Sequence, residues 1–291
     1  MKILIADSFD KSLPGRLAKF GEVIEDMGRI GEAEAILVRS KTKGDKALID
    51  KAPNLKLIIR GGVGVDSIDV PYAKSKGIEV RNTPEASSVA VAELAFALMI
   101  ALPNRIIYGH EGMAKGEWRK NDIKRTELMG KTLGLIGIGR IATEVAIRAK
   151  AFGMKVIAYD KFVSASPHAE MMAFDDVLKQ ADYVSLHTPL TDETRGMFNK
   201  DVFAKMKKGA YMINTGRGKC VIEADLVAAL ESGQLAGYGT DVWYSDPPEN
   251  TPIVKAPNTV MLPHIGASSK ENLLRIGDCC VAIFEEFTKK K

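Results

Sequence analysis

The chain has 291 residues, of which 46% are hydrophobic and 27% are charged, and its formal net charge is +4. This balance is typical of a globular protein long enough for two domains, and it excludes a mainly disordered chain. The small net charge and the lack of a dense Lys/Arg block argue against a nucleic-acid partner and favour an anionic small molecule.

The cysteines and the apolar segments restrict the cellular context. Cys220, Cys279 and Cys280 have neither the spacing of a zinc site nor that of a disulfide framework, so we expect no metal and a reducing compartment. An acid at Asp7 comes too early for a signal peptide. The longest apolar segment, from Val89 to Leu102, is too short to span a membrane. We therefore predict a cytoplasmic protein without a membrane partner.

In the first third of the chain, short β-rich runs alternate with helical segments, which is typical of a parallel sheet covered by helices. The predicted strands are 2–6, 22–24, 35–39, 57–60 and 78–81. The predicted helical segments are 11–20, 46–52 and 87–102, the last capped by the hydroxyl of Ser87 or Ser88.

A second alternating series follows. Its predicted strands are 132–136, 155–159, 183–186, 210–214, 237–241 and 259–262. Helices are predicted at 140–151, 199–206, 223–232 and 270–289, with Gly153 and Gly233 ending two of them. The fold class is therefore α/β, with two parallel-sheet domains.

The glycine-rich segment after the strand 132–136 predicts a dinucleotide site. Its pattern is Gly137-x-Gly139-x-x-Ala142: the first glycine permits a tight turn, the second lets the backbone approach a pyrophosphate, and the small alanine lets the helix pack closely. The next strand ends at Asp160, where a carboxylate binds the adenosine ribose and repels a 2′-phosphate. We therefore predict NAD rather than NADP, although the neighbouring Lys161 is a cation that can soften this preference.

Three polar side chains follow the last three strands of this series. They are Arg217, Asp246 and His264, and ligands of open α/β sheets bind at this edge. Separately, they have structural interpretations as a surface residue, a turn residue before two prolines and a packed histidine. Together they supply a planar fork for a carboxylate, a proton shuttle and a group that orients the imidazole. The set predicts hydride transfer at a small 2-oxo or 2-hydroxy acid.

These residues and several further motifs resemble the D-isomer-specific 2-hydroxyacid dehydrogenase family over nearly the whole chain. The matching segments are 38–42, 60–66, 137–142, 215–218, 241–247 and 263–269. The resemblance implies a substrate domain built from residues 1–95 and 267–291, Rossmann-like and flavodoxin-like sheets, and an inserted NAD domain at 96–266. It also implies a homodimer.

The resemblance also implies roles for individual residues. Arg217 binds the substrate, His264 is the acid/base, and Asp246 stands where the family usually has a glutamate. Val63 and Gly64 offer backbone N–H groups to the substrate carboxylate. The implied cofactor contacts are Gly137, Gly139, Arg140, Ile141, Asp160, Thr188, Thr215, Gly216, Asp241, His264, Gly266 and Ala267.

Asp246 is one methylene shorter than glutamate, so its pairing with His264 requires a closer backbone or a water. Ser67 and Ser87 stand where asparagines are common in the family. Because the chain ends soon after its last helix, we expect no C-terminal regulatory domain and no serine inhibition.

Arg39, Lys41 and Arg60 lie at or beyond strand ends where they can meet a phosphate, which favours 3-phosphoglycerate and phosphohydroxypyruvate as substrates; alternatively they are solvated loop charges. Glyoxylate, hydroxypyruvate and D-lactate remain alternatives. One alternative of another class is an NAD(H)-sensing corepressor-like binding protein. A second is another dinucleotide or adenosyl enzyme that shares the glycine loop.

Overall fold

The computed structural model describes residues 1–289, so Lys290 and Lys291, at the end of the predicted substrate domain, lie outside the described residues. The chain divides into two compact units. Unit 1 comprises Met1–Ala90 and Ala267–Lys291, and unit 2 comprises Val91–Gly266. The roles of these units stay predictions. The predicted boundaries are 1–95 with 267–291 for the substrate domain and 96–266 for the cofactor domain.

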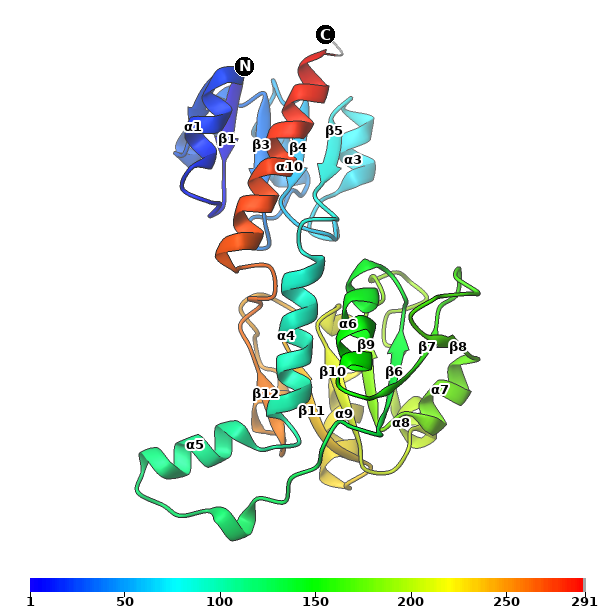
Figure 1. The fold of residues 1–291 in the computed structure, drawn as a ribbon. Helices are drawn as coiled ribbons and strands as arrows, with labels where there is room; N and C mark the ends of the chain where they lie inside the picture. The colour runs from blue at the N-terminus through cyan, green and yellow to red at the C-terminus, as the bar shows by residue number, and fades with distance from the viewer. Residues whose placement is uncertain (290–291) are drawn as a thin grey trace. The chain divides into compact units, whose positions relative to one another are not determined.

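Unit 1 is built on a five-stranded parallel sheet in the order β2-β1-β3-β4-β5 (Figure 1). The strands are β1 (Lys2–Ile5), β2 (Glu22–Ile24), β3 (Ala35–Val38), β4 (Leu57–Arg60) and β5 (Glu79–Asn82). The helices are α1 (Leu13–Leu17), α2 (Lys46–Asp50), α3 (Val70–Ser75) and α10 (Lys270–Lys289). This strand order is the flavodoxin-like one.

Alternate side chains of the unit 1 strands pack on opposite faces of the sheet. Ile3 and Ile5 face a core formed with α1 and α10, whereas Leu4 faces a core formed with α2 and α3. The strands are buried on both faces, which explains why they are continuous runs of Val, Ile, Leu and Ala rather than alternating sequences.

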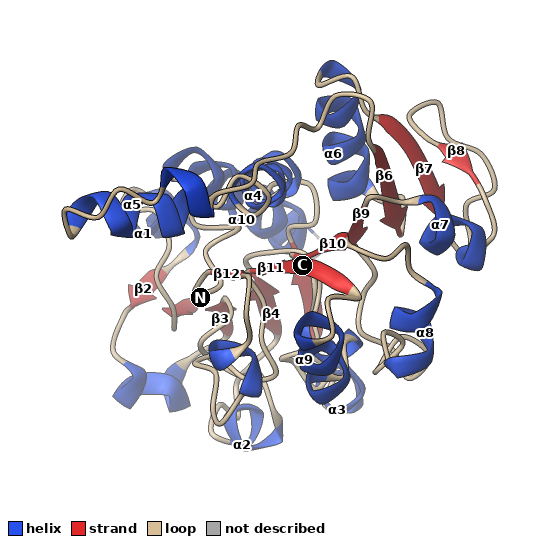
Figure 2. Cartoon of the chain, turned by 90° about the horizontal axis from the view of Figure 1, so that it is seen from below, coloured by secondary structure: helices blue, strands red, loops and turns tan. Residues whose placement is uncertain are grey.

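Unit 2 is built on a seven-stranded parallel sheet in the order β12-β11-β10-β9-β6-β7-β8 (Figure 2). The strands are β6 (Thr132–Ile136), β7 (Lys155–Tyr159), β8 (Glu170–Met171), β9 (Tyr183–Leu186), β10 (Ala210–Asn214), β11 (Leu235–Thr240) and β12 (Thr259–Met261). The helices are α4 (Ser88–Ala101), which begins in unit 1, α5 (Ile106–Ala114), α6 (Arg140–Ala151), α7 (Phe174–Gln180), α8 (Lys200–Lys205) and α9 (Glu223–Glu231). The chain reverses its direction of progress across the sheet between β6 and β9, which is where ligands bind in this architecture.

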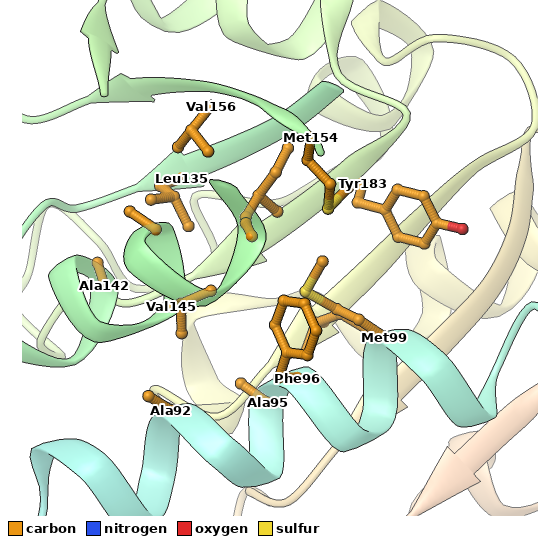
Figure 3. Close-up of a cluster of buried hydrophobic side chains, with 14 of the residues drawn as sticks. Ala92, Ala95, Phe96, Met99, Leu135, Ala142, Val145, Met154, Val156 and Tyr183 are labelled. Atoms are coloured by element: carbon orange, nitrogen blue, oxygen red, sulfur yellow. The ribbon is translucent and has the colours of Figure 1, made fainter. Parts of the chain in front are cut away.

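The core of unit 2 has one layer on each side of the sheet. Phe96 and Met99 of α4 meet Val145 of α6, and Leu135 and Tyr183 of the sheet lie in the same cluster (Figure 3). Helices α7, α8 and α9 cover the opposite face. The predicted α/β class with two parallel sheets is confirmed.

Several predicted elements differ from the structure. Helices α3, α5 and α7 and the two-residue strand β8 were not predicted. The apolar side chains of α5 are exposed, at 48% for Ile106 and 58% for Met113, so its sequence lacks the pattern of a helix packed on its own core. The Ser88 hydroxyl has no hydrogen-bond partner among residues 1–289, so it does not cap α4. Ser87 instead accepts a bond from Asn272 Nδ2.

Strands β6, β7, β9 and β10 of unit 2 have the predicted bounds, while β11 starts two residues earlier and ends one residue earlier than expected. Asp241 therefore lies just beyond its strand.

Within residues 1–289 no single helix meets the length and hydropathy that a membrane crossing requires. The bent pair α4 and α5 meets them only jointly.

Candidate active site and cofactor site

The loop between β6 and α6 has the backbone geometry that its glycines predict. Gly137 has a φ of +90°, and a Cβ at this residue would lie 3.0 Å from the His187 carbonyl oxygen, so a side chain there would be strained and crowded. A Cβ at Gly139 would have no atom of residues 1–289 within 4 Å outside its chain neighbours. Arg140 and Ile141 begin α6 beside this open space, and Ala142 is fully buried beneath it. The helix N-terminus is therefore accessible to an anionic group.

The Asp160 carboxylate is fixed at the carboxyl end of β7. One oxygen accepts a bond from Ile138 N at 3.0 Å, and the other accepts bonds from Phe162 N at 2.8 Å and Val163 N at 3.2 Å. Asp160 thus shapes both the glycine loop and the turn that follows it. An ionised carboxylate has about four acceptor positions, so one remains for a ribose hydroxyl.

The turn after β10 carries Arg217. The Asn214 side chain shapes this turn, because its Oδ1 accepts a bond from Gly216 N and its Nδ2 donates to Arg217 O, both at 3.0 Å. Arg217 is half-buried, and its Nη1 donates to Gly216 O at 2.8 Å. A Cβ on Gly218 would overlap the backbone of Trp243, so this turn packs directly against the segment after β11.

His264 and Asp246 form a hydrogen-bonded pair between His264 Nδ1 and Asp246 Oδ2. Each side chain is 32% exposed, so the pair is accessible to a substrate. The shorter acid therefore reaches the imidazole without a bridging water. His264 has a φ of +56°, a strained backbone conformation for a residue with a side chain.

Asp241 holds the backbone beside this histidine. Its carboxylate, which is 2% exposed, accepts bonds from Ile265 N at 2.8 Å and Gly266 N at 2.7 Å. Burial raises the pKa of Asp241, while the two backbone donors and the nearby His264 oppose that rise. Sequence reasoning placed Asp241 among the cofactor contacts but did not predict this role in the His264 loop.

Two threonines with implied cofactor contacts lie at neighbouring strand ends. The Thr215 hydroxyl is buried and has no partner within the described part of the chain, although a buried hydroxyl normally has one. Among residues 1–289 the Thr188 hydroxyl has one hydrogen-bond partner, the sulfur of Met197 at 3.9 Å. The open space at Gly139, the fixed Asp160 carboxylate and the unpartnered Thr215 hydroxyl together fit a dinucleotide.

The predicted substrate residues of unit 1 lie around the carboxyl ends of β3 and β4. Arg39 Nη1 donates to Ser8 O at 3.1 Å and its Nη2 to Ala267 O at 2.9 Å, while Lys41 is exposed. Burial lowers the pKa of Arg39, and the charge of Asp7 opposes this. Arg60 Nη1 donates to Gly61 O at 3.2 Å.

Backbone positions in unit 1 are set by two polar side chains that the sequence reasoning did not assign. Asp7 Oδ1 accepts a bond from the Thr42 hydroxyl at 2.7 Å, and its Oδ2 accepts bonds from the backbone N–H groups of Arg39 and Thr42. Asn82 Nδ2 donates to Val63 O, next to Gly64. The only signal in the sequence for these two roles was an acid or amide at the carboxyl end of a predicted strand.

Within residues 1–289, no three His, Cys, Asp or Glu side chains are grouped to hold a metal ion.

Comparisons with known proteins agree with this geometry. Residues 96–266 match the model of the D-isomer specific 2-hydroxyacid dehydrogenase NAD binding domain. A hydroxypyruvate reductase of Thermotoga maritima is 43% identical over 90% of this chain and 87% of its own length. A D-3-phosphoglycerate dehydrogenase of Methanocaldococcus jannaschii is 40% identical over 93% of this chain and 54% of its own. The chain thus spans about half the length of the D-3-phosphoglycerate dehydrogenases it matches.

A solved structure supports the same relationship. The D-lactate dehydrogenase of Aquifex aeolicus, determined as a complex with NAD and lactic acid, superposes with a TM-score of 0.88. It is 32% identical, and the match covers 99% of this chain and 96% of that one.

Proposed function

The chain belongs to the D-isomer-specific 2-hydroxyacid dehydrogenase family, and we propose that it moves a hydride between NAD and a D-2-hydroxy acid, preferentially 3-phosphoglycerate. The oxidised partner is then 3-phosphohydroxypyruvate, and the reaction is the first step of serine biosynthesis. The observation that carries the proposed reaction is the His264–Asp246 hydrogen bond, formed by a side-chain pair that remains accessible. Arg217 follows β10, which lies two positions from β12, the strand that precedes His264, in the same sheet.

The proposed mechanism assigns one task to each side chain. The glycine loop at Gly137 and the Asp160 carboxylate would hold NAD, which when bound would supply the acceptor for the hydride of C2 of the hydroxy acid. Arg217 binds the substrate carboxylate with its planar fork and polarises the C2 oxygen. His264 Nδ1 is turned toward Asp246, so His264 Nε2 takes the hydroxyl proton as the C2 carbonyl forms. Asp246 stabilises the charged imidazole, and reduction of the oxo acid runs through the same steps in reverse.

The preference for a phosphorylated acid rests on the positive charges of unit 1. Arg39, Lys41 and Arg60 surround the ends of β3 and β4, and Lys41 is exposed. Next to Arg60, the proposed carboxylate contacts are the backbone N–H groups near Val63 and Gly64. A phosphate carries about −1.5 to −2 charge at neutral pH, so even one exposed cation contributes to its binding.

Hydroxypyruvate is the second candidate substrate, for two reasons. The Thermotoga relative matches at nearly full length, and Arg39 already donates to the carbonyls of Ser8 and Ala267. Those bonds leave fewer Arg39 donors for a phosphate. Glyoxylate and D-lactate, or pyruvate in the reductive direction, follow as further alternatives with the same chemistry.

The test follows NADH absorbance with phosphohydroxypyruvate, hydroxypyruvate, glyoxylate and pyruvate in parallel. We expect kcat/KM for phosphohydroxypyruvate to exceed the others by roughly 10-fold or more. Lys41→Met is expected to remove most of that preference, whereas Lys43→Met, which removes an exposed lysine two residues away, is the matched control. Preference for hydroxypyruvate would leave the mechanism and overturn the substrate. Absence of turnover with every acid would favour an NAD(H)-sensing binding protein.

We also infer a cytoplasmic homodimer. The exposed apolar side chains of α5, Ile106, Ile107 and Met113, support association. No disulfide joins the cysteines of the described residues, which supports a reducing compartment. Light scattering coupled to size exclusion tests the dimer, because a monomeric mass at micromolar concentration contradicts it.

A further inference from the structure

We propose that Glu193 increases the preference for NAD over NADP by neutralising Lys161, the cation beside the proposed ribose-binding carboxylate. Lys161 Nζ lies 2.6 Å from both carboxylate oxygens of Glu193. The two residues are 32 positions apart, in the loops that follow β7 and β9. This inference rests on the proposed binding of NAD with its ribose at Asp160.

If Lys161 is left unpaired, its charge favours binding of NADP, which carries a 2′-phosphate, over binding of NAD, which does not. The 2′-phosphate of NADP is a dianion near neutral pH, and Asp160 repels it from the end of β7. A lysine directly after Asp160 supplies the compensating positive charge for that phosphate. Paired with Glu193, the same lysine belongs to a neutral pair, so Asp160 governs the preference.

Glu193 lies within a hydrogen-bonded turn. Thr191 N donates to the Thr194 hydroxyl at 2.8 Å, and that hydroxyl donates to Pro189 O at 2.6 Å. Arg195 N closes the turn on Thr191 O at 2.9 Å. From this turn the Glu193 carboxylate contacts Lys161 Nζ, just beyond the end of β7.

Asp160 is equally fixed on its side. Its three backbone hydrogen bonds hold the carboxylate against the glycine loop and against the turn that contains Lys161 and Phe162. The spacing between Asp160 and Lys161 is therefore set by the backbone. What can vary is the partner of the Lys161 ammonium, which is Glu193 in this structure and a 2′-phosphate in an NADP complex.

The Lys161–Glu193 pair is exposed, with 53% and 68% of the side-chain surfaces accessible, so its effect is moderate. We expect Glu193→Gln to raise NADPH affinity relative to NADH about five-fold. In a Lys161→Met background, the same substitution is expected to change the ratio less than two-fold. That difference separates neutralisation of Lys161 from a general loss of negative charge.

The experiment titrates the full chain with NADH and with NADPH and measures both dissociation constants by the fluorescence of the bound cofactor. The matched control is Glu170→Gln, which breaks an exposed ion pair with Lys155 of 3.0 Å at the opposite end of β7 and is expected to leave the ratio unchanged. Thermal unfolding of each variant establishes that it is folded.

The outcomes distinguish this inference from the proposed function. If the unmodified chain binds neither cofactor, or if Asp160→Ala leaves the NADH preference intact, the proposed cofactor site itself is wrong. If NADH is preferred and Asp160→Ala weakens the preference, but Glu193→Gln does not change it, only the role of Glu193 is refuted. An equal effect of Glu193→Gln with and without Lys161 refutes it as well.

Discussion

His187 is predicted to lower the free energy of unfolding of unit 2 as the pH falls. The residue follows β9, and its Nε2 lies 2.8 Å from the hydroxyl of the fully buried Ser185. Its backbone N donates to Ile136 O at 2.8 Å, directly before Gly137 of the cofactor loop. Burial lowers the pKa of His187 to about 4, from an ordinary value of about 6.5.

The sign of the effect follows from proton uptake. Above pH 6.5 the imidazole is neutral in both folded and unfolded chains, so stability is fully present. Between pH 6.5 and about 4 only the unfolded chain takes up the proton, and stability is lost at up to about 1.4 kcal/mol per pH unit. At pH 5 the upper limit is about 2 kcal/mol, and we expect about 1–2 kcal/mol because part of His187 reaches solvent.

The test compares the chain with His187→Gln, which keeps a polar group near Ser185 but cannot be protonated. Urea unfolding at pH 7.5 and pH 5.0 is expected to show the variant gaining about 1–2 kcal/mol relative to the unmodified chain at the lower pH. His110→Gln, which removes an exposed histidine of the same unit, is the control and is expected to show no such gain. If the difference between His187→Gln and the unmodified chain is the same at both pH values, the argument from burial is wrong.

Three further predictions concern the proposed active site. Arg217→Lys is expected to lower kcat/KM for the 2-oxo acid roughly 100-fold, because lysine lacks the planar fork, while the NADH dissociation constant stays within about two-fold. Asp246→Asn is expected to lower kcat about 10- to 100-fold, because a neutral amide does not stabilise a charged His264; stopped-flow turnover of Asp246→Glu, expected to be near normal, is the control. Asp241→Asn leaves one backbone donor at Ile265 or Gly266 without an acceptor, so we expect a loss of about 1–2 kcal/mol and a fall in Tm of about 2–8 °C in calorimetry.

The strands near the proposed cofactor site were predictable because burial on both faces makes them short runs of apolar residues. The glycines that follow mark where β6 ends and α6 begins, and the structure places both elements at the predicted bounds. Helix α5 was missed for the opposite reason. Its apolar residues are exposed rather than packed on the chain's own core, and Gly109 and Gly112 weaken its helix propensity.

The chemistry of the proposed site was predictable from residue types, but its hydrogen bonds were not. Asp246 and His264 are 18 positions apart, and nothing in the sequence states that the shorter acid reaches the ring. Asp160 illustrates a different limit. Its carboxylate also has a structural role, because it accepts bonds from the turn that follows, and this role does not exclude a contact with the ribose.

The loops at the three strand ends also make stabilising contacts outside the reactive side chains. The Thr240 hydroxyl donates to Val242 O at 2.9 Å, Trp243 Nε1 donates to Leu262 O at 3.0 Å, and Gly218 packs on Trp243. Such a scaffold keeps Arg217 and His264 in place whichever acid is reduced. The proposed phosphate contacts, in contrast, all lie in unit 1. We therefore expect exchanges at Lys41 to alter the order of preferred acids while the roles of Arg217 and His264 stay the same.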